Sequence, residues 1–328
     1  MKRLATLLLL LLTGWSALAQ TPDSTLYSMA QNTGELSKKK LIRYVEKQLD
    51  GEEEIALFFY YWMGLHIDYD YRLMNASSRA FSARQTIAIR ERLLPDNVYK
   101  LRRSICSGYA SLYQHLLGQF GIQSEIVAGY TKQPRDLRAG REVASDHAWN
   151  TVKIDENWYL VDVTWAAPIM EYEALRNFYF KTTPSHFVYD HMPENEADQF
   201  LDQPYDLEWM NRKVATTPRY FAFSEGEDRS ISWHQTNGDS LVVEIAKDSD
   251  GWKLSPVAVD NQDQLLQDLN FELEQLDNGR LRYTISNFPA GAILRMDGRK
   301  GDQFSWTTWD GFLYITPEST VKLKAGPN

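Results

Sequence analysis

The segment RRSICSGYASLYQHLLGQFGI, residues 102–122, carries the only cysteine of the chain. Apolar residues recur in it at helical spacing, which predicts a helix that begins at Ser104 or Ile105 and runs to Gln119. Cys106 then lies at or just before the first helical turn, where unpaired backbone N–H groups stabilise an anion. This position makes Cys106 a candidate reactive thiol.

A single cysteine in a chain of 328 residues cannot form an internal disulfide. It is therefore buried and inert, paired with another molecule, or chemically active. The first interpretation is the common one, because free cysteine is among the most buried residue types. Only the surroundings of the thiol can favour chemistry over packing.

The N-terminus has the pattern of an export signal. Lys2 and Arg3 precede an apolar run that includes Leu7 to Leu12, and small residues precede a cleavage point after Ala19. We expect residues 1–19 to be a signal peptide and the mature protein to be secreted or periplasmic. The apolar run is too short for a membrane span. Cleavage would make the net charge of −9 two units more negative, which argues against a nucleic-acid partner.

The length of the chain and its 43% hydrophobic content suit two folded domains. After a polar lead-in over residues 20–34, the predicted elements are helices over 36–49, 52–66 and 79–94, strands over 122–130, 147–154 and 158–165, and a loop over 131–143. From about residue 217, short alternating runs separated by Gly, Asp and Asn are typical of a β-sandwich. We therefore divide the mature chain into a domain of helices and a sheet, residues 20–215, and a β-sandwich-like domain, residues 216–328.

A cysteine nucleophile needs a base within hydrogen-bond reach and a third group that orients the base. His147 begins one predicted strand, and Asp162 lies near the end of the next. If Asp155 and Glu156 form a two-residue hairpin loop, His147 and Asp162 become diagonal neighbours on one face of the sheet, whereas an odd-length loop would separate them. Asn150 is the rival orienting residue, but it lies three positions beyond His147 and so points to the opposite face.

The remaining histidines fit no metal pattern. His186 and His191 lie close together in the sequence, but no cysteine or acidic pair completes a zinc spacing with them. The sequence also contains no glycine-rich phosphate loop and no nucleophilic serine motif. We expect neither a metal nor a cofactor.

Four segments resemble the transglutaminase-like superfamily, in particular its kyphoscoliosis peptidase-like branch: ICSGYASLYQHLLGQFGI, AGYTK, HAWNTVKI and NWYLVDVTW. The later FYFKTTPSHFVYDHMPENEADQFL is similar to the tail that often follows this core, so the resemblance covers roughly residues 45–205. It implies an α+β, papain-like core in which helices pack on an antiparallel sheet. It also implies Cys106 as nucleophile, His147 as general base and Asp162 as the residue that orients His147.

The activity that the resemblance implies is that of an exported thiol enzyme acting on peptide or carboxamide bonds through a thioester. Hydrolysis would make it a protease or amidase, and transfer to an amine a transglutaminase; we favour hydrolysis, because no surface for a crosslinking partner is evident. The expected partner is a protein or peptide substrate. The alternative is a non-catalytic binding or scaffold module of the cell envelope, although a scaffold has no need of all three residues. No spacing selects a side-chain oxyanion donor among Trp62, Tyr69 and Gln85, and no acidic cluster suggests calcium sites.

Overall fold

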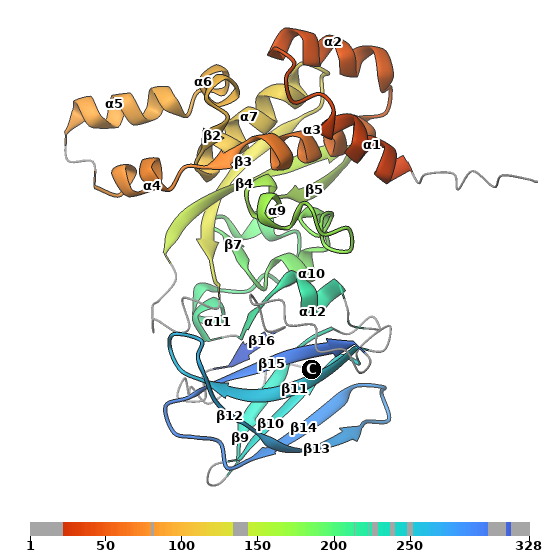
Figure 1. Cartoon of the computed structure of the whole chain (residues 1–328), viewed down its shortest axis with the longest axis vertical. Helices are drawn as coiled ribbons and strands as arrows, with labels where there is room; N and C mark the ends of the chain where they lie inside the picture. Colours follow the sequence, from red (N-terminus) through yellow and green to blue (C-terminus); the bar gives the residue numbers. More distant parts are fainter. Residues whose placement is uncertain are drawn as a thin grey trace, which may run out of the picture.

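The computed structural model describes residues 22–79, 82–133, 144–212, 214–222, 224, 229–236, 240–247, 252–300 and 313–315. Two units follow each other along the long axis of the molecule, one of helices and a five-stranded sheet and one of two further sheets (Figure 1). The expected signal peptide, residues 1–19, lies outside the described residues. No helix within the described ranges is long and apolar enough to cross a bilayer.

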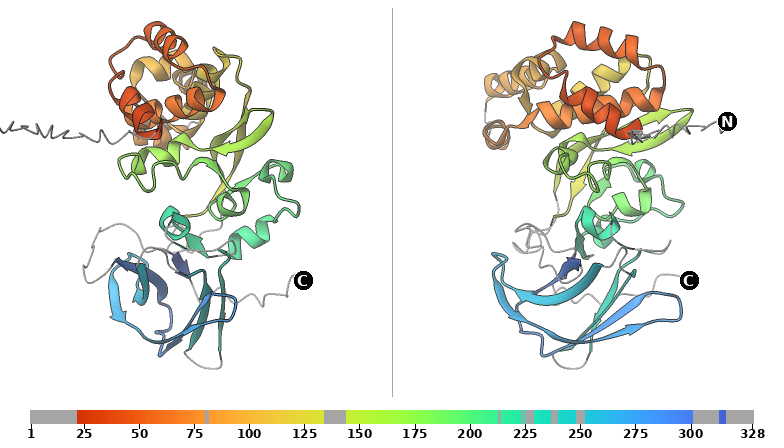
Figure 2. Two further views of the ribbon diagram at one scale, coloured as in Figure 1. Left: turned by 90° about the vertical axis from the view of Figure 1, so that its right-hand side faces the viewer. Right: turned by 45° about the vertical axis from the view of Figure 1, so that its right-hand side comes forward.

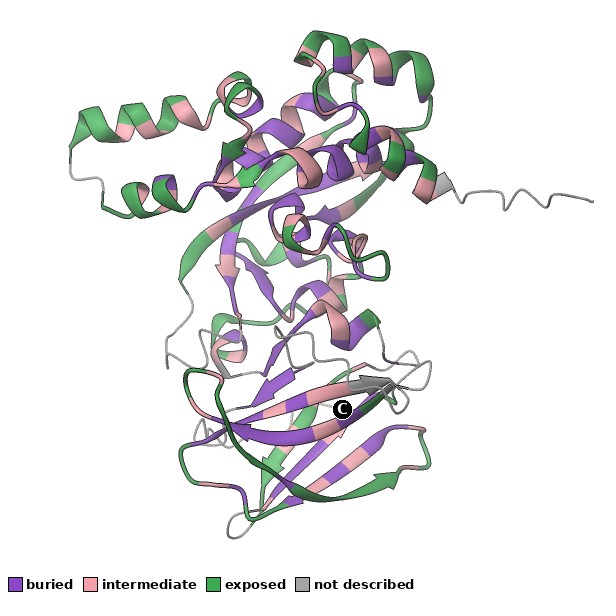
Figure 3. Ribbon diagram, in the orientation of Figure 1, coloured by how far each residue is buried: buried purple, intermediate pink, exposed green. Residues whose placement is uncertain are grey.

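Helices form the outer layer of the first unit. They are α1 (Pro22–Gln31), α2 (Lys38–Gln48), α3 (Glu52–His66), α4 (Tyr71–Ser77), α5 (Ala83–Arg92), α6 (Pro95–Leu101) and α7 (Cys106–Gly118). Eight residues of α3 between Ile55 and Met63 are buried, so this helix is enclosed on nearly all sides and forms the centre of the layer (Figure 3). A short parallel pair, β1 (Asp68–Tyr69) with β2 (Arg103–Ser104), brings the chain that leaves α3 beside the start of α7.

An antiparallel sheet supports these helices, with the strand order β6-β5-β4-β3-β7. Its strands are β3 (Ser124–Thr131), β4 (Ser145–Ile154), β5 (Asn157–Val161), β6 (Phe180–Thr182) and β7 (His191–Pro193). Helix α7 packs on β3 and β4, and α3 packs on α7. The unit therefore has the predicted α+β architecture, with the cysteine helix directly on the central strands.

The hairpin of β4 and β5 has the two-residue loop that the sequence predicts. Asp155 and Glu156 both have positive φ, 47° and 67°, which is the geometry of a tight hairpin turn. Ile154 pairs with Asn157 across this loop, and the ladder continues without a shift. The even register on which the pairing of His147 with Asp162 depends is therefore confirmed.

The predicted strand over residues 158–165 is too long. β5 ends at Val161, and the short helix α9 (Val163–Ala166) follows it. Asp162 is the residue that ends the strand, because its carboxylate accepts hydrogen bonds from the backbone N–H groups of Thr164 and Trp165 and so caps α9. Asp162 thus lies at a strand-to-helix junction.

Three helical predictions also differ from the structure. The polar lead-in over residues 20–34 contains α1, and the helix predicted over residues 79–94 is the shorter α5. Pro95, which directly follows the predicted helix, begins the separate helix α6. A proline at the first position of a helix costs nothing, because its missing N–H would have no partner there.

The segment after β5 returns to the sheet through short elements. The 3₁₀ helix η1 (Ala167–Ile169) precedes β6, and α10 (Pro184–Phe187) lies between β6 and β7; the 3₁₀ helix η2 (Glu196–Gln199) and α11 (Leu207–Arg212) follow β7. Strand β7 joins the sheet edge beside β3, where Thr131 pairs with His191 and Gly129 pairs with Pro193. This closure places residues from around position 190 against the strands that carry His147 and Asp162.

The second unit is a β-sandwich. One sheet has the order β13-β14-β10-β9 and the other β12-β11-β15-β16-β8, and Figure 2 shows both from the side. The strands are β8 (Ala215–Thr216), β9 (Ser232–Gln235), β10 (Leu241–Ile245), β11 (Trp252–Val259), β12 (Leu265–Asp268), β13 (Asn270–Gln275), β14 (Leu281–Ser286), β15 (Ile293–Lys300) and β16 (Leu313–Ile315). Val243 of β10 and Leu294 of β15 belong to one buried cluster, so the sheets share a core.

Aromatic residues join the two units. Phe221 on α12 (Pro218–Ala222) stacks on His186 with ring centroids 4.5 Å apart, and it also contacts Phe178 and Tyr189. The backbone N–H of Ile231 donates a hydrogen bond to the Tyr189 hydroxyl. The expected boundary at residue 216 falls within β8, which pairs with β16, and the division into two domains stays a prediction.

Candidate active site

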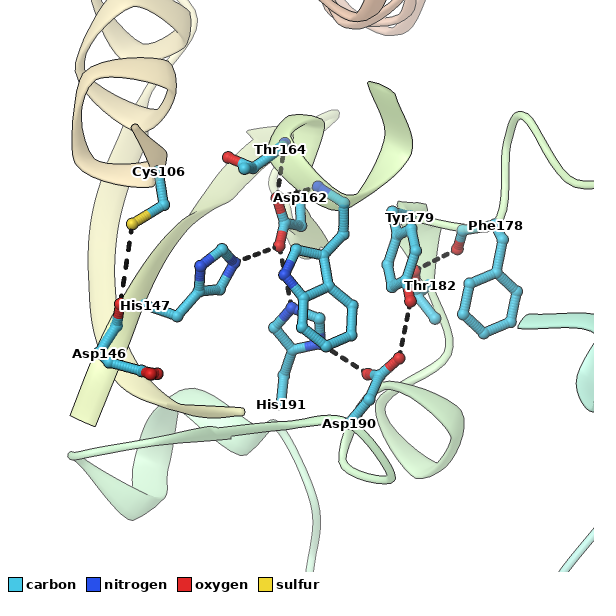
Figure 4. Close-up of polar contacts among 11 residues, drawn as sticks. Cys106, Asp146, His147, Asp162, Thr164, Phe178, Tyr179, Thr182, Asp190 and His191 are labelled. Atoms are coloured by element: carbon cyan, nitrogen blue, oxygen red, sulfur yellow. Dashed lines mark hydrogen bonds and ion pairs between the residues drawn. The ribbon is translucent and has the colours of Figure 1, made fainter. Parts of the chain in front are cut away.

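Cys106 is the first residue of α7, as predicted. The preceding Ile105 offers no side-chain cap to the helix, so no capping side chain occupies the helix N-terminus at the thiol. Cys106 is buried, with 8% of its surface exposed, but it belongs to none of the hydrophobic clusters that the described residues form. Its sulfur lies 3.9 Å from the backbone oxygen of Asp146 on β4, beside the ring of His147 (Figure 4).

Gly108 explains how the start of α7 fits so closely against β2. A Cβ atom at this position would lie 1.9 Å from the Oγ atom of Ser104 and 3.1 Å from a methyl group of Val98. Only glycine therefore allows this approach, which fixes the helix turn that carries Cys106. Ser104 on β2 is thus the close partner of Gly108.

His147 and Asp162 form the hydrogen bond that the hairpin register predicts. The Nε2 atom of His147 lies 2.6 Å from Oδ2 of Asp162, and the His147 side chain is only 7% exposed. With Nε2–H donated to the carboxylate, the other ring nitrogen, Nδ1, faces the Cys106 side (Figure 4). Asn150 points elsewhere, because its amide donates to the backbone oxygen of Ala110 on α7.

The charges of this pair reinforce each other. Burial opposes protonation of His147, but the nearby charge of Asp162 and the hydrogen bond to it outweigh burial, and together with a hydrogen bond that the ring donates to the Cys106 sulfur they raise the pKa of His147 to about 10. Burial would likewise raise the pKa of Asp162, but the charge and hydrogen bond of His147, followed by those of His191, hold it well below its usual range. The geometry therefore favours an imidazolium paired with a carboxylate.

Asp162 is also anchored on its second oxygen. Oδ1 accepts the backbone N–H of Thr164 at 2.7 Å and that of Trp165 at 3.1 Å. Because these bonds come from the first turn of α9, the carboxylate cannot rotate without uncapping the helix. The strand-to-helix junction after β5 thus orients Asp162 toward His147.

His191 is a member of the site that the sequence analysis missed. Its Nε2 atom lies 2.9 Å from Oδ2 of Asp162, the same oxygen that accepts from His147, and its Nδ1 atom lies 2.6 Å from Oδ1 of Asp190. In the sequence, the only role that the position of His191 suggests is that of a metal ligand near His186, and no zinc spacing completes it. The pairing of β7 with β3 brings His191 to the site, and no local sequence pattern predicts that pairing.

The ligand-type atoms of His147, Asp162 and His191 all lie within 4.8 Å of one another. Each of these atoms already takes part in a direct hydrogen bond within the cluster. The side chains of Asp162 and His191 are both 0% exposed, which leaves no open position for water or substrate. We interpret the cluster as a hydrogen-bonded network.

The three oxyanion candidates occupy different places. Trp62 is fully buried and donates its indole N–H to the backbone oxygen of Thr33, and Gln85 takes part in the capping box of α5 with Ser82. Tyr69 lies on β1 and pairs with Ser104, two residues before the thiol. Of the three, only Tyr69 is thus held beside the start of α7.

Comparisons with known proteins match the region that carries this geometry. The family model described as the transglutaminase-like superfamily matches residues 39–163, a range that includes Cys106, His147 and Asp162. Residues 39–163 are a transglutaminase-like domain. The domain consists of helices packed on an antiparallel sheet, which is the architecture that the sequence resemblance implies.

Relatives of this transglutaminase-like domain share part of the chain. The kyphoscoliosis peptidase of Mus musculus is 28% identical over 188 residues, which are 55% of this chain and 27% of that protein, and the Homo sapiens protein is 27% identical over 186 residues, or 54% and 26%. The chain thus spans about a quarter of the length of these relatives. Cytokinesis protein 3 of Schizosaccharomyces pombe is 33% identical over 97 residues, 28% of this chain and 11% of that protein.

A solved structure described as a crystal structure of a TGase is 15% identical and covers 46% of this chain and 35% of its own. Its TM-score of 0.29 is too low to bear on the site.

His191 and Asp190 lie beyond the end of the matched transglutaminase-like domain at residue 163.

Proposed function

We propose that the protein is a thiol enzyme that acts on peptide or carboxamide bonds through a thioester on Cys106. The observation that carries the proposal is the His147–Asp162 pair beside the helix N-terminus that holds the thiol. A cysteine nucleophile, a histidine base and an orienting acid are the parts that acyl transfer requires. The transglutaminase-like domain and its peptidase relatives support a protein or peptide as the substrate.

The first half of the proposed reaction forms the thioester. The protonated His147 stabilises the Cys106 thiolate, whose sulfur attacks the carbonyl carbon of the amide. The developing oxyanion accepts hydrogen bonds from backbone N–H groups at the start of α7, that of Cys106 in particular. His147 then gives its proton to the leaving amine, the C–N bond breaks, and the acyl group remains on sulfur.

The second half releases the acyl group. Water, or an amine in the transferase version, gives a proton to the now neutral His147 and attacks the thioester carbonyl. The C–S bond breaks, and the thiolate and imidazolium are restored together. Asp162 stabilises the imidazolium at both ends of the cycle, and of the two fates of the thioester we favour hydrolysis. The N-terminal pattern supports export as part of this proposal.

The test is to trap the acyl-enzyme. Purified protein is mixed with peptides, cell-wall fragments and small amine donors, and intact-mass spectrometry records any covalent adduct. We expect an acyl adduct on Cys106 that disappears in the Cys106→Ala variant and that free amines or water discharge. A folded protein that forms no adduct on Cys106 with any of these, and whose thiol reacts no faster than free cysteine, would favour the scaffold alternative.

A further inference from the structure

Polar side chains continue behind Asp162 as an unbroken buried chain. His191 bonds to Asp162, Asp190 bonds to His191 at 2.6 Å, and the hydroxyl of Tyr179 donates to Oδ2 of Asp190 at 2.7 Å (Figure 4). The proposed reaction uses only the His147 end of this chain. Three buried polar residues therefore remain without an assigned role.

The bonds of His191 define its protonation state. Both of its ring nitrogens lie against carboxylate oxygens, of Asp190 and of Asp162. An ionised carboxylate only accepts hydrogen bonds, so both ring nitrogens must donate, and an imidazole that donates twice is positively charged. Tyr179 donates its hydroxyl to the other oxygen of the same carboxylate, Oδ2 of Asp190.

The environment holds this ring in one orientation. Phe187 stacks on His191 with ring centroids 4.2 Å apart, Trp165 lies at 4.4 Å and Trp149 at 5.1 Å. The His191 side chain is 0% exposed, so no water competes for its hydrogen bonds. A charge enclosed in this way persists only if its partners compensate it, and two carboxylates do so here.

A close approach of strands places His191 there. Gly129 on β3 pairs with both His147 and Pro193, and a Cβ atom on it would lie 2.3 Å from the backbone oxygen of Met192. Only a glycine allows β7 to come this near β3. The fold thus brings a second histidine to the carboxylate that serves the first.

We propose that His191 is a positioning residue whose doubly protonated ring fixes the Asp162 carboxylate and shares its negative charge. This role rests on the proposed function, because it acts through Asp162 on His147. Without the second cation, Asp162 would bind the proton of His147 more strongly, and the imidazolium would give up its proton to the leaving amine less readily. The charged or titratable groups around His191 are His147 from β4, Asp162 after β5, Tyr179 before β6 and the adjacent Asp190.

The first test uses the unaltered full chain with ¹⁵N-labelled histidine. At neutral pH, long-range ¹H–¹⁵N spectra distinguish a ring with two N–H groups from a neutral tautomer. We expect His191, assigned through the signal lost in His191→Gln, to show two protonated nitrogens. A neutral tautomer at His191 would overturn the proposal whatever the reactivity of Cys106.

The second test compares His191→Gln with the matched control His186→Gln, a histidine that stacks on Phe221 outside the network. In His191→Gln the downfield Nε2–H resonance of His147 should move further downfield, because Asp162 becomes a stronger acceptor. The control should leave this resonance unchanged. An unchanged or upfield resonance in folded His191→Gln would mean that His191 only fills space.

If His191→Gln does not fold, the variant Asp190→Asn tests the same proposal. This variant keeps the shape and the Tyr179 contact but removes the charge that supports the His191 cation. We expect a downfield shift of the His147 resonance in the same direction but smaller, and no shift would overturn the proposal. The reactivity of Cys106 toward iodoacetamide is measured separately, so that an inert thiol counts against the proposed enzyme and not against the charge on His191.

Discussion

His147 donates its Nε2–H to Oδ2 of Asp162 over 2.6 Å, although fifteen residues separate them in the chain. The two-residue loop at Asp155 and Glu156 sets this contact, since its even length puts both side chains on one face of the sheet. The helix cap at Asp162 then holds the carboxylate in place. The hairpin register and the helix cap together thus set the orientation of the base.

Asp162→Asn should lower the rate at which iodoacetamide alkylates Cys106 at mildly acidic pH. The amide cannot hold the charge of His147, whose pKa would fall from about 10 toward its ordinary value and leave the thiolate without its partner. We expect a loss of about tenfold or more, the effect of one pKa unit. The rate is followed by mass spectrometry of the Cys106 adduct.

Asn150→Ala is the control for this change, since Asn150 was the rival orienting residue. Its amide donates to Ala110, Ser124 and Glu125, so its loss should cost about 1–3 kcal/mol of stability while the alkylation rate of the folded protein stays the same. Equal rate losses in both variants would contradict the assigned register, and a loss in Asn150→Ala alone would give the role to Asn150.

The pair should make stability depend on pH in two opposite senses. The raised pKa of His147 means that its contribution is complete below its ordinary value of about 6.5 and is lost as the pH rises toward 10. The depressed pKa of Asp162 means that its contribution is complete above about 4 and is lost as the pH falls. The difference in unfolding free energy between the wild type and His147→Gln should therefore be largest between about pH 4 and about pH 6.5. Urea denaturation across pH measures it, and a constant difference would be the contrary result.

Gly108→Ala should destabilise the protein by about 1–3 kcal/mol and displace the thiol, because the new Cβ would meet Ser104. Ser104→Ala in the same chain should restore part of the loss, since the Ser104 hydroxyl is buried without a hydrogen-bond partner. Thermal unfolding of both single variants and the double variant measures this coupling.

Gly118→Ala is the control on the same helix, where a Cβ would have no atom within 4 Å. That change should stabilise the protein by about 0.5–1 kcal/mol, because alanine loses less backbone entropy in a helix. Similar effects at positions 108 and 118 would refute the contact with Ser104.

Phe221→Ala should weaken the junction between the two units. Phe178 and Tyr189, which contact Phe221, directly adjoin Tyr179 and Asp190 of the buried network. We expect a loss of about 3 kcal/mol or more, as for other buried phenylalanines, and a broader thermal transition. Leu266 on β12 is 54% exposed, so Leu266→Ala should change neither the stability nor the width of the thermal transition. Two independent transitions already in the wild type would show that the junction carries no coupling.

Local sequence patterns were sufficient for the parts of the site built by neighbouring residues. Helical spacing placed Cys106 at the start of α7, and strand alternation with a two-residue loop placed His147 and Asp162 as diagonal neighbours on one face of the sheet. The strand predicted to residue 165 failed because the side chain of Asp162 competes for the backbone and starts a helix. Alternation alone does not reveal that competition.

His191 could not be predicted in the same way. Its position depends on β7 pairing with β3, two strands that are joined through β4, β5 and β6. Pairings at such sequence separation leave no periodic signal in either strand. The close approach also requires Gly129, whose purpose appears only when the backbone of Met192 is placed against it.

The central claim is that the His147–Asp162 pair activates Cys106 as a nucleophile. Its most direct test is the rate of iodoacetamide alkylation of the purified protein at mildly acidic pH, compared with free cysteine, whose thiol ionises at about pH 8.5. We predict that Cys106 reacts faster than free cysteine there and that His147→Gln removes the advantage. A Cys106 that reacts no faster than free cysteine, or that reacts equally without His147, would contradict the account.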